Sequence, residues 1–394
     1  MDPLMLDPSR RTPSSWEGAW TRRHALTALG AALASPGLLH AQDGEPLRIG
    51  QSIATSGPLG ELGQTLVNGA KAGFAAINAK GGVNGRPIEL VTKDDGYDVK
   101  RAVENTQALL DDRSIFALFN CFGTPMIEAV LPKIIDAGIP FFAPFSGALS
   151  IRPRNARNVF HLRASYADEA EQLVQHLATV GMKRIGVVYQ ANSFGKEFLV
   201  AAQKALSRHG MQPVVEVTVE NNGSDAGSAA VKVAQAAPEA ALLGLGGKPT
   251  VDFVRAIRQE RKGLQLYALS VMGTAATLKT LGDDATGMTI SQVVPLPSNP
   301  SRAIVRDFQQ AWSAAAPGQD ASHVALEGYI SARAFAEFAR RAGKNPTRSA
   351  FIDAAWNAKT LDLGGFPLNF NEGSAQTPRF VELTMVSRQG RFIR

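Results

Sequence analysis

Between residues 115 and 150, two short apolar runs are joined by a stretch with helical character. Residues 115–120 (IFALFN) and 139–143 (IPFFA) predict strands, and residues 125–137 predict the helix between them. A strand, a helix and a second strand of this length make a right-handed parallel unit. The same alternation recurs along most of the chain, which predicts an α/β fold with helices on both faces of parallel sheets.

Small residues and hydroxyl groups follow both of these strands. The first strand is followed by Cys121-Phe122-Gly123-Thr124-Pro125, in which Thr124 is placed to cap the helix, and the second by Pro144-Phe145-Ser146-Gly147-Ala148. Ligands bind α/β sheets at the carboxyl ends of the strands, and a helix N-terminus there favours an anion. The two turns therefore predict a binding site. The simpler alternative is that Thr124 only caps a helix and Ser146 only turns the chain.

The size and composition of the chain predict a soluble protein of two domains. Its 394 residues exceed one ordinary core, 45% are hydrophobic and 19% are charged. Lys and Arg outnumber Asp and Glu by 41 to 35, but the excess is spread thinly and is not interleaved with aromatic residues. A mildly basic, solvated surface explains this better than nucleic-acid binding does. The single cysteine, Cys121, excludes an internal disulfide and lies in no CxxC motif.

The first 41 residues have the features of an export signal. Arg22 and Arg23 precede an uncharged stretch over residues 25–39, which ends shortly before Ala41. The paired arginines and the Ala- and Gly-rich stretch are similar to a twin-arginine signal, so we expect export to the periplasm and cleavage near Ala41. An amphipathic N-terminal helix is the alternative. The stretch is too short for a good membrane span, and no other segment reaches the ~20 apolar residues required.

The chain carries few residues arranged for catalysis. It has no G-x-S-x-G or H-E-x-x-H motif, and its histidines lack metal-ligand spacing. Residues 244–250 superficially resemble a phosphate loop but have Pro249 where Ser or Thr binds magnesium, and residues 57–63 do not fit G-x-G-x-x-G. The acid pairs Asp94-Asp95 and Asp111-Asp112 have no nucleophile or acid–base partner. We therefore expect a binding protein that is not an enzyme, with no catalytic residues, metal or cofactor.

Several short motifs occur in the order and spacing of a known family. They are Ser56-Gly57-Pro58, the run from Ile77 to Gly85 (INAKGGVNG), Asp94-Asp95 with Asp98, Gly138-Ile139-Pro140 before the second turn, Phe194-Gly195, and Leu281-Gly282 with Gly287. In these motifs the chain after residue 41 resembles the leucine/isoleucine/valine-type periplasmic solute-binding proteins of ABC importers. The resemblance implies an α/β fold of two Rossmann-like lobes, joined by three crossovers around a ligand cleft.

The two series of alternating strands and helices fit this two-lobed fold. We expect residues 46–162 and 296–363 to form the first lobe, and residues 163–295 and 364–394 to form the second. The crossovers then lie at the boundaries between these ranges. Closure of the lobes on a ligand would be a hinge motion that a few connector residues absorb.

The resemblance also implies which residues meet the ligand. Those of the first lobe would bind a carboxylate through hydroxyl and N–H donors and cover its apolar side, which is an efficient way to hold an anion. In the second lobe, Phe194 and Lys248 stand where relatives that bind aliphatic amino acids have Tyr. Ser270 stands where those relatives have an acid. The implied residues are Leu62, Gly123, Thr124, Phe145, Ser146, Gly147, Phe194, Lys248 and Ser270.

The departures from the family pattern bear on the ligand. A buried ammonium group needs an acid beside it, which Ser270 does not supply, and Lys248 would repel an ammonium group. Lys248 suits a second anionic group on the ligand, or is simply a solvated loop residue. Asp95 or Glu327 could supply an acid, but nothing in the sequence places either one in the cleft.

These observations together predict an exported, monomeric receptor. We expect it to capture a small carboxylate-bearing solute, either a branched-chain or neutral amino acid or another organic acid, for an ABC import permease. The alternative is a ligand-sensing regulatory protein of the same fold that acts on a signalling partner. A Rossmann-type enzyme is disfavoured by the missing nucleotide fingerprint, and no nucleic-acid partner is expected.

Overall fold

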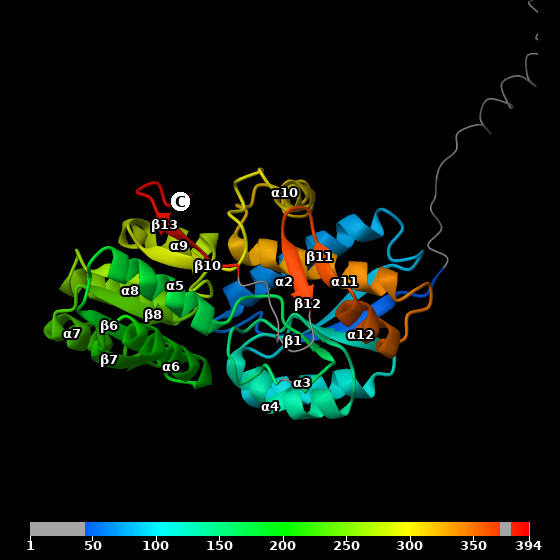
Figure 1. The fold of residues 1–394 in the computed structure, drawn as a ribbon, viewed down its shortest axis with the longest axis horizontal. Helices are drawn as coiled ribbons and strands as arrows, with labels where there is room; N and C mark the ends of the chain where they lie inside the picture. The colour runs from blue at the N-terminus through cyan, green and yellow to red at the C-terminus, as the bar shows by residue number, and fades with distance from the viewer. Residues whose placement is uncertain (1–43, 154, 371–379, 394) are drawn as a thin grey trace, which may run out of the picture. The chain divides into compact units, whose positions relative to one another are not determined.

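The computed structural model describes residues 44–153, 155–370 and 380–393, which form a parallel sheet and a mostly parallel sheet, both covered by helices, and a small hairpin (Figure 1). The chain separates into residues 1–41 and residues 42–394. The predicted export signal at residues 1–41 lies outside the described part. Among the described helices, none combines the length and the apolar character that a membrane span requires.

The first sheet has five parallel strands in the order β2-β1-β3-β4-β5. They are β1 (Leu47–Ile53), β2 (Ile88–Asp94), β3 (Ile115–Phe119), β4 (Phe141–Phe142) and β5 (Val159–Phe160). The predicted strand–helix–strand unit is observed as β3, α4 (Thr124–Asp136) and β4. The sequence interpretation did not include β5, because two residues are too few to show a periodic pattern.

Helices cover both faces of the first sheet (Figure 1). One face carries α3 (Val99–Asp111) and α4, and the other carries α2 (Gly60–Asn78), α10 (Ala303–Ala315), α11 (His323–Arg341) and α12 (Arg348–Asn357). A buried aromatic core lies between the sheet and this second group of helices, and includes Phe74, Phe119, Phe142, Phe335 and Phe351.

Glycines bring the backbones of α2 and α11 into direct contact. A Cβ atom on Gly69 would lie 1.9 Å from the carbonyl oxygen of Ala325, and one on Gly328 would lie 2.2 Å from that of Leu66. Only glycine leaves room for this approach. The contact holds the N-terminal end of α2 and the first turns of α11 in fixed relative positions, and both carry residues discussed below.

The second sheet has the strand order β14-β13-β10-β9-β8-β6-β7. Its parallel strands are β6 (Ile185–Gln190), β7 (Pro213–Val219), β8 (Ala240–Gly244), β9 (Gln265–Ala268) and β10 (Thr289–Gln292), and its antiparallel additions are β13 (Glu382–Val386) and β14 (Phe392–Ile393). The helices of this part are α5 (Tyr166–Thr179), α6 (Ser193–Arg208), α7 (Ala226–Ala236), α8 (Lys248–Glu260) and α9 (Ala275–Leu281).

The chain passes between the two sheets more than once. It leaves the first sheet between β5 and α5, returns between β10 and α10, and rejoins the second sheet at β13. Before this last passage, β11 (Lys359–Asp362) and β12 (Pro367–Phe370) form a hairpin whose buried Phe366 and Leu368 belong to the aromatic core of the first sheet. The lobe boundaries stay predictions, and because of these contacts we propose the third one after Phe370 instead of at Gly364.

Candidate functional site

Three residues with strained backbones follow strands of the first sheet. Tyr97, Asn120 and Ala143 come after β2, β3 and β4 and have φ angles of 64°, 46° and 54°. Residues other than glycine rarely adopt positive φ, and strain of about 1–3 kcal/mol per residue persists mainly at functional sites. The carboxyl ends of these parallel strands meet at one edge of the sheet. The strain therefore marks this edge as the candidate site.

The start of α4 differs from the sequence-based prediction. Gly123, with a φ of 96°, is the N-cap residue and Thr124 is the first residue of the helix, so the prediction that Thr124 caps the helix is wrong. A Cβ atom on Gly123 would lie 2.3 Å from Cε of Met126 and 2.8 Å from Cε2 of Tyr97, so only glycine fits. The Thr124 hydroxyl is not used for capping and bonds elsewhere.

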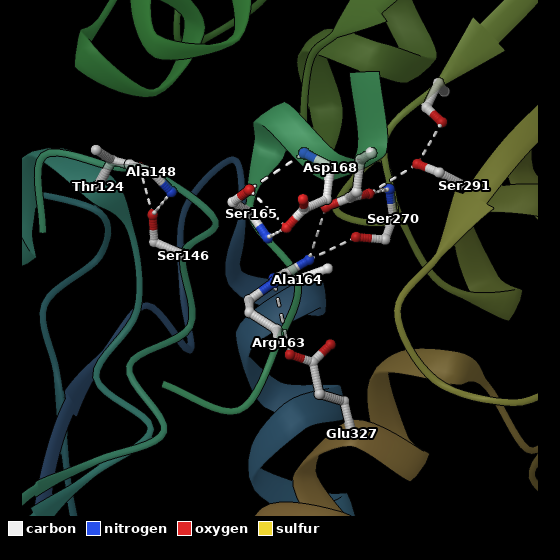
Figure 2. Close-up of polar contacts among 12 residues, drawn as sticks. Thr124, Ser146, Ala148, Arg163, Ala164, Ser165, Asp168, Ser270, Ser291 and Glu327 are labelled. Carbon is white, nitrogen blue, oxygen red and sulfur yellow. Dashed lines mark hydrogen bonds and ion pairs between the residues drawn. The ribbon is translucent and has the colours of Figure 1, made fainter. Parts of the chain in front are cut away.

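Two buried hydroxyl groups lie at this edge. Oγ1 of Thr124 is 2.8 Å from Oγ of Ser146, and both side chains are fully buried (Figure 2). Ser146 Oγ also accepts a hydrogen bond from the N–H of Ala148 at 3.2 Å, and the hydroxyl of Tyr166 lies nearby. Burial raises the pKa of Tyr166, so its phenol stays protonated at neutral pH and can donate a hydrogen bond.

Backbone hydrogen bonds hold the surrounding turns together. The N–H of Phe145 donates to the carbonyl of Cys121 at 2.8 Å, and the N–H of Gly123 donates to the carbonyl of Phe145 at 3.3 Å. The N–H of Tyr166 donates to the carbonyl of Gly147 at 2.8 Å. Thr124 and the turn Phe145-Ser146-Gly147, predicted at the ligand's carboxylate, are therefore brought together, with Gly123 beside them.

A buried guanidinium group supports the Ser146 turn from behind. Arg152 is 9% exposed and donates to the carbonyl oxygens of Ser146 at 3.4 Å, Ala148 at 3.3 Å and Arg163 at 3.1 Å. Burial lowers the pKa of Arg152 to about 10, so the group is still protonated at neutral pH. Its positive charge beside the turn favours an anion at the hydroxyl groups.

A small cavity adjoins these hydroxyl groups. Its empty volume is ≈ 240 Å³, which includes open solvent, and only ≈ 10 Å³ of it can hold the centre of a water molecule, so side chains nearly fill it. Its lining is apolar and aromatic apart from the Thr and Tyr hydroxyl groups and contains no acid: Leu59, Leu62, Tyr97, Phe122, Gly123, Thr124, Tyr166, Phe194, Gly246 and Val271. The predicted Leu62 and Phe194 thus line the same cavity as Thr124, from opposite parts of the fold.

The side chains of Lys248 and Ser270 do not line this cavity. Lys248 is exposed and pairs with Asp252 one helical turn away, and its Nζ donates to the carbonyl of Asn222 at 3.2 Å. Ser270 is buried, accepts a hydrogen bond from Arg163, and donates its N–H to Glu169 at 2.9 Å. Among the described residues that line the cavity there is no cation, and neither Lys248 nor Ser270 belongs to them.

The acids considered for an ammonium group are also engaged elsewhere. Asp95 is buried, accepts hydrogen bonds from Ser52 at 2.7 Å and from the N–H of Tyr97 at 3.0 Å, and burial raises its pKa to about 6. Glu327 faces Arg163 at 3.7 Å. Neither residue lines the cavity.

Sequence reasoning missed several lining residues for two different reasons. Tyr97 lies in the turn three residues after the end of β2, so the rule of polar residues at strand ends, which pointed to Thr124, applied to it as well. Tyr166 begins α5 immediately after its capping box, Ser165 with Asp168, and only the tertiary structure shows that its ring turns to the cavity. Gly246 and Val271 approach across the cleft from the second lobe, which no local pattern reveals, and Leu59 precedes α2 in the first.

Contacts across the cavity close this arrangement. The carboxylate of Glu61, in the first turn of α2, accepts hydrogen bonds from Thr274 and Thr277 at the start of α9. The N–H of Lys248 donates to the carbonyl of Pro58 at 3.0 Å. Asn192, the N-cap residue of α6, lies near the hydroxyl of Tyr97, whose pKa burial raises. The structure therefore describes the closed conformation of the cleft.

A cleft of this kind between two α/β lobes is shared with a known family. The model of the periplasmic binding protein family matches residues 46–391. The chain belongs to the periplasmic binding protein family. The predicted resemblance is thereby confirmed, and so is the predicted fold of two lobes.

Curated members of the family match this chain in part. The Leu/Ile/Val-binding protein homolog 7 of Brucella abortus (strain 2308) is 26% identical over 205 residues, which are 50% of this chain and 51% of that protein. The Leu/Ile/Val-binding protein of Escherichia coli (strain K12) is 26% identical over 186 residues, 47% of this chain and 49% of that protein. The chain spans about half the length of the curated relatives that it matches.

Solved structures match nearly the whole fold. A substrate-binding periplasmic protein from Ralstonia solanacearum is 30% identical, with a TM-score of 0.82 over 88% of this chain and 99% of that chain. A possible leucine/isoleucine/valine-binding protein from Rhodopirellula baltica SH 1 is 27% identical, with a TM-score of 0.83 over 92% and 98%. A solute-binding protein from R. palustris, solved in complex with benzoate, is 19% identical with a TM-score of 0.79 over 88% and 95%, a likeness of fold.

Proposed function

We propose that this chain is the periplasmic solute receptor of an ABC importer and captures a small molecule with a carboxylate on an apolar body. The observation that carries the proposal is the hydrogen-bonded hydroxyl pair of Thr124 and Ser146 at the side of an otherwise apolar cavity, which Thr124 and Tyr166 line. Hydroxyl and N–H donors at a helix N-terminus bind a carboxylate with charge-assisted hydrogen bonds. The buried Arg152 adds a favourable charge behind them.

The walls of the cavity suit an apolar body of modest size. Leu62 and Phe122 from the first lobe face Phe194 and Val271 from the second. Tyr97 and Tyr166 add two further aromatic rings, and Tyr166 lies 5.2 Å from Phe194 between ring centroids. Aromatic rings bury much apolar surface and pack well against both rings and branched aliphatic groups. The ligand class that fits is an aromatic or branched aliphatic acid.

The absence of an acid from the described lining argues against an amino acid. A buried ammonium group without a partner is costly, and the nearest candidate acids are already paired with Arg163 or with Ser52. We therefore propose that the carboxylate is the only charged group of the ligand that the cavity binds. Neutral amino acids, which the names of two curated relatives indicate for those proteins, are the second candidate.

Matched pairs of ligands test this assignment. L-Leucine and 4-methylpentanoate differ only in the amino group, as do L-phenylalanine and 3-phenylpropanoate, and benzoate serves as a shorter aromatic acid. We expect the acids without an amino group to raise the melting temperature of the chain, because a ligand that binds the folded state stabilises it by mass action. A rise with the amino acids alone would show that an acid reaches the cavity. Turnover of any of these compounds would contradict a receptor that is not an enzyme.

The remaining parts of the proposal concern location and partners. We propose export by the segment at residues 1–41, action in the periplasm as a monomer, and delivery of the solute to a membrane permease. The membership in the periplasmic binding protein family supports this assignment. Co-purification of the liganded chain with its permease tests the partner, and binding to a cytoplasmic regulator instead would favour the ligand-sensing alternative.

A further inference from the structure

A group of buried charges lies where the chain first passes between the lobes. Its members, called here the crossover cluster, are Arg163, Glu169, Ser270, Ser291 and Glu327 (Figure 2). Arg163 follows β5, Glu169 lies in α5, and Glu327 lies in α11. The cluster thus joins α11 of the first lobe to α5 and the β9 and β10 ends of the second through one guanidinium group.

The contacts of the guanidinium group are specific. Nη2 of Arg163 is 3.5 Å from Oε1 of Glu169 and also donates to the hydroxyl of Ser270, and Nε is 3.7 Å from Oε1 of Glu327. The side chain of Arg163 is only 1% exposed and that of Glu169 is fully buried. Oε2 of Glu169 accepts hydrogen bonds from the N–H of Ser270 at 2.9 Å and from the hydroxyl of Ser291 at 2.7 Å.

The same guanidinium group lies against two residues of the ligand site. Its Cζ is 4.5 Å from the ring centroid of Phe145 and 6.0 Å from that of Tyr166. Phe145 belongs to the turn that carries Ser146, and Tyr166 lines the cavity. A cation over an aromatic face is attracted by the ring, most strongly where water is excluded. Arg163 therefore contacts the back of the site without lining the cavity.

The charges of the crossover cluster do not balance. One guanidinium group faces two carboxyl groups, and Nε and Nη1 of Arg163 have no hydrogen-bond partner among the described residues. Burial raises the pKa of Glu327 to about 7, against the lowering effect of Arg163. The charged groups that face Glu327 are Arg163 from the crossover and Glu169 from α5, while α2, packed along α11, contributes the backbones of Leu66 and Ala70 near Gly328.

We propose that Arg163 is a positioning residue for solute capture: it holds Phe145 and Tyr166 in place from behind and ties this arrangement to carboxylates from both lobes. The proposal rests on the proposed function, since it concerns the same cavity. The same guanidinium group therefore contacts carboxylates from both lobes and two aromatic rings of the binding site. A lysine in this position would keep the charge but lose the planar group that meets two carboxylates and two rings at once.

Variants of Arg163 with a matched control test the proposal. Arg163→Met and Arg163→Lys are compared with Arg208→Met, which removes a different guanidinium group, paired with Glu171 on the surface and 66% exposed. We expect Arg163→Met to weaken binding of 4-methylpentanoate and 3-phenylpropanoate by about tenfold, as found for residues coupled to a site without touching its ligand. Arg163→Lys should recover only part of this loss, and Arg208→Met should bind like the unaltered chain.

Hydrogen exchange measured without ligand tests the role of Arg163 independently of which solute the chain binds. The N–H of Tyr166 bonds the carbonyl of Gly147, and that of Ala148 bonds Ser146, so hydrogen exchange at these two amides reports the geometry of the site. Both Arg163 variants should exchange faster there than Arg208→Met does. Failure of the acids to bind the unaltered chain would overturn the proposed function, whereas the exchange rates would still decide the role of Arg163.

The pH dependence of ligand affinity is a second measurement. A variant that is merely less stable would not alter this pH dependence. Ionisation of Glu327 adds a negative charge beside Arg163, so the dissociation constant of a carboxylate ligand should rise with pH through the neutral range, and Glu327→Gln should reduce this rise. Should Arg163→Met fail to fold, Arg163→Lys and Glu327→Gln carry the test. Affinity and amide exchange in Arg163→Lys equal to those of Arg208→Met would overturn the proposal.

Discussion

The hydroxyl groups of Thr124 and Ser146 lie 2.8 Å apart although 22 positions separate the two residues in the chain. The first belongs to the opening turn of α4 and the second to the turn after β4, and these turns meet because β3 and β4 are parallel neighbours in the sheet. In the proposed function, one hydroxyl proton joins the pair and the other is donated to the ligand's carboxylate. This relationship makes the pair the first target for substitution.

Removing either hydroxyl should weaken ligand binding. We expect Thr124→Val and Ser146→Ala each to lower the affinity for 4-methylpentanoate by ~1.5–3 kcal/mol, the range for a hydrogen bond to a charged group. Because the two groups touch, the double variant should lose less than the sum of the single losses. Isothermal titration calorimetry measures these values, and Thr179→Ala, on the surface of α5, is the control. Unchanged affinity in both single variants would contradict the site.

Gly123 and Gly138 form a matched pair of glycines. Both have positive φ, 96° and 59°, but a Cβ atom on Gly123 would meet Met126 and Tyr97, whereas one on Gly138 would have nothing within 4 Å. Gly138→Ala should therefore cost only the backbone strain of about 1–2 kcal/mol. Gly123→Ala should destabilise the chain further and abolish binding. Urea unfolding and ligand titration of the two variants test this, and equal effects would show that the packing at Gly123 is unimportant.

Glu61 joins the lobes in the closed conformation through Thr274 and Thr277. The carboxylate is partly exposed, so its removal should cost about 1 kcal/mol of closed-state stability, or a roughly fivefold faster release of ligand. Stopped-flow dissociation of the bound acid from Glu61→Ala measures this rate. Glu104→Ala, an exposed acid on α3, should release ligand at the original rate.

The titration of Glu327 should make stability depend on pH. Its pKa is about 7 in the folded chain against an ordinary 4.5, so the folded chain holds an extra proton between these values. The contribution of Glu327 to the free energy of unfolding is therefore largest below pH 4.5. This contribution is lost as the pH rises through about 7. His323 acts in the opposite sense, because burial lowers its pKa to about 3 and its contribution is lost as the pH falls below 6.5.

Comparison of melting temperatures isolates the contribution of Glu327. The difference between the unaltered chain and Glu327→Gln removes the effect of His323, which both share. We expect this difference to change between pH 4.5 and 7, with the unaltered chain losing stability relative to the variant. A difference that stays constant over this interval would show that Glu327 does not titrate there.

The paired arginines of the N-terminal segment allow a test of export. Replacement of Arg22 and Arg23 by Lys should block export if the segment is a twin-arginine signal. Cell fractionation with detection of cleavage near Ala41 measures this. Normal processing of the variant would indicate the general export route.

The sequence by itself determined the class of fold and one wall of the site. Apolar runs of strand length alternate with helical patterns, and this alternation depends on local periodicity, so the βαβ unit and the position of its strand ends could be located without a structure. The rule that parallel sheets bind ligands at carboxyl strand ends then led to Thr124 and Ser146. A strand of two residues, β5, carries no such period and was missed.

Only the tertiary structure decided how distant groups pair. Gly123 replaces Thr124 as the N-cap because the crowding by Met126 and Tyr97 exists only in the folded chain. Ser270 bonds Arg163, 107 positions away, and does not line the cavity. A side chain's partner depends on packing between lobes, which local sequence does not encode, whereas the order of strands and helices follows from burial of each segment's own apolar face.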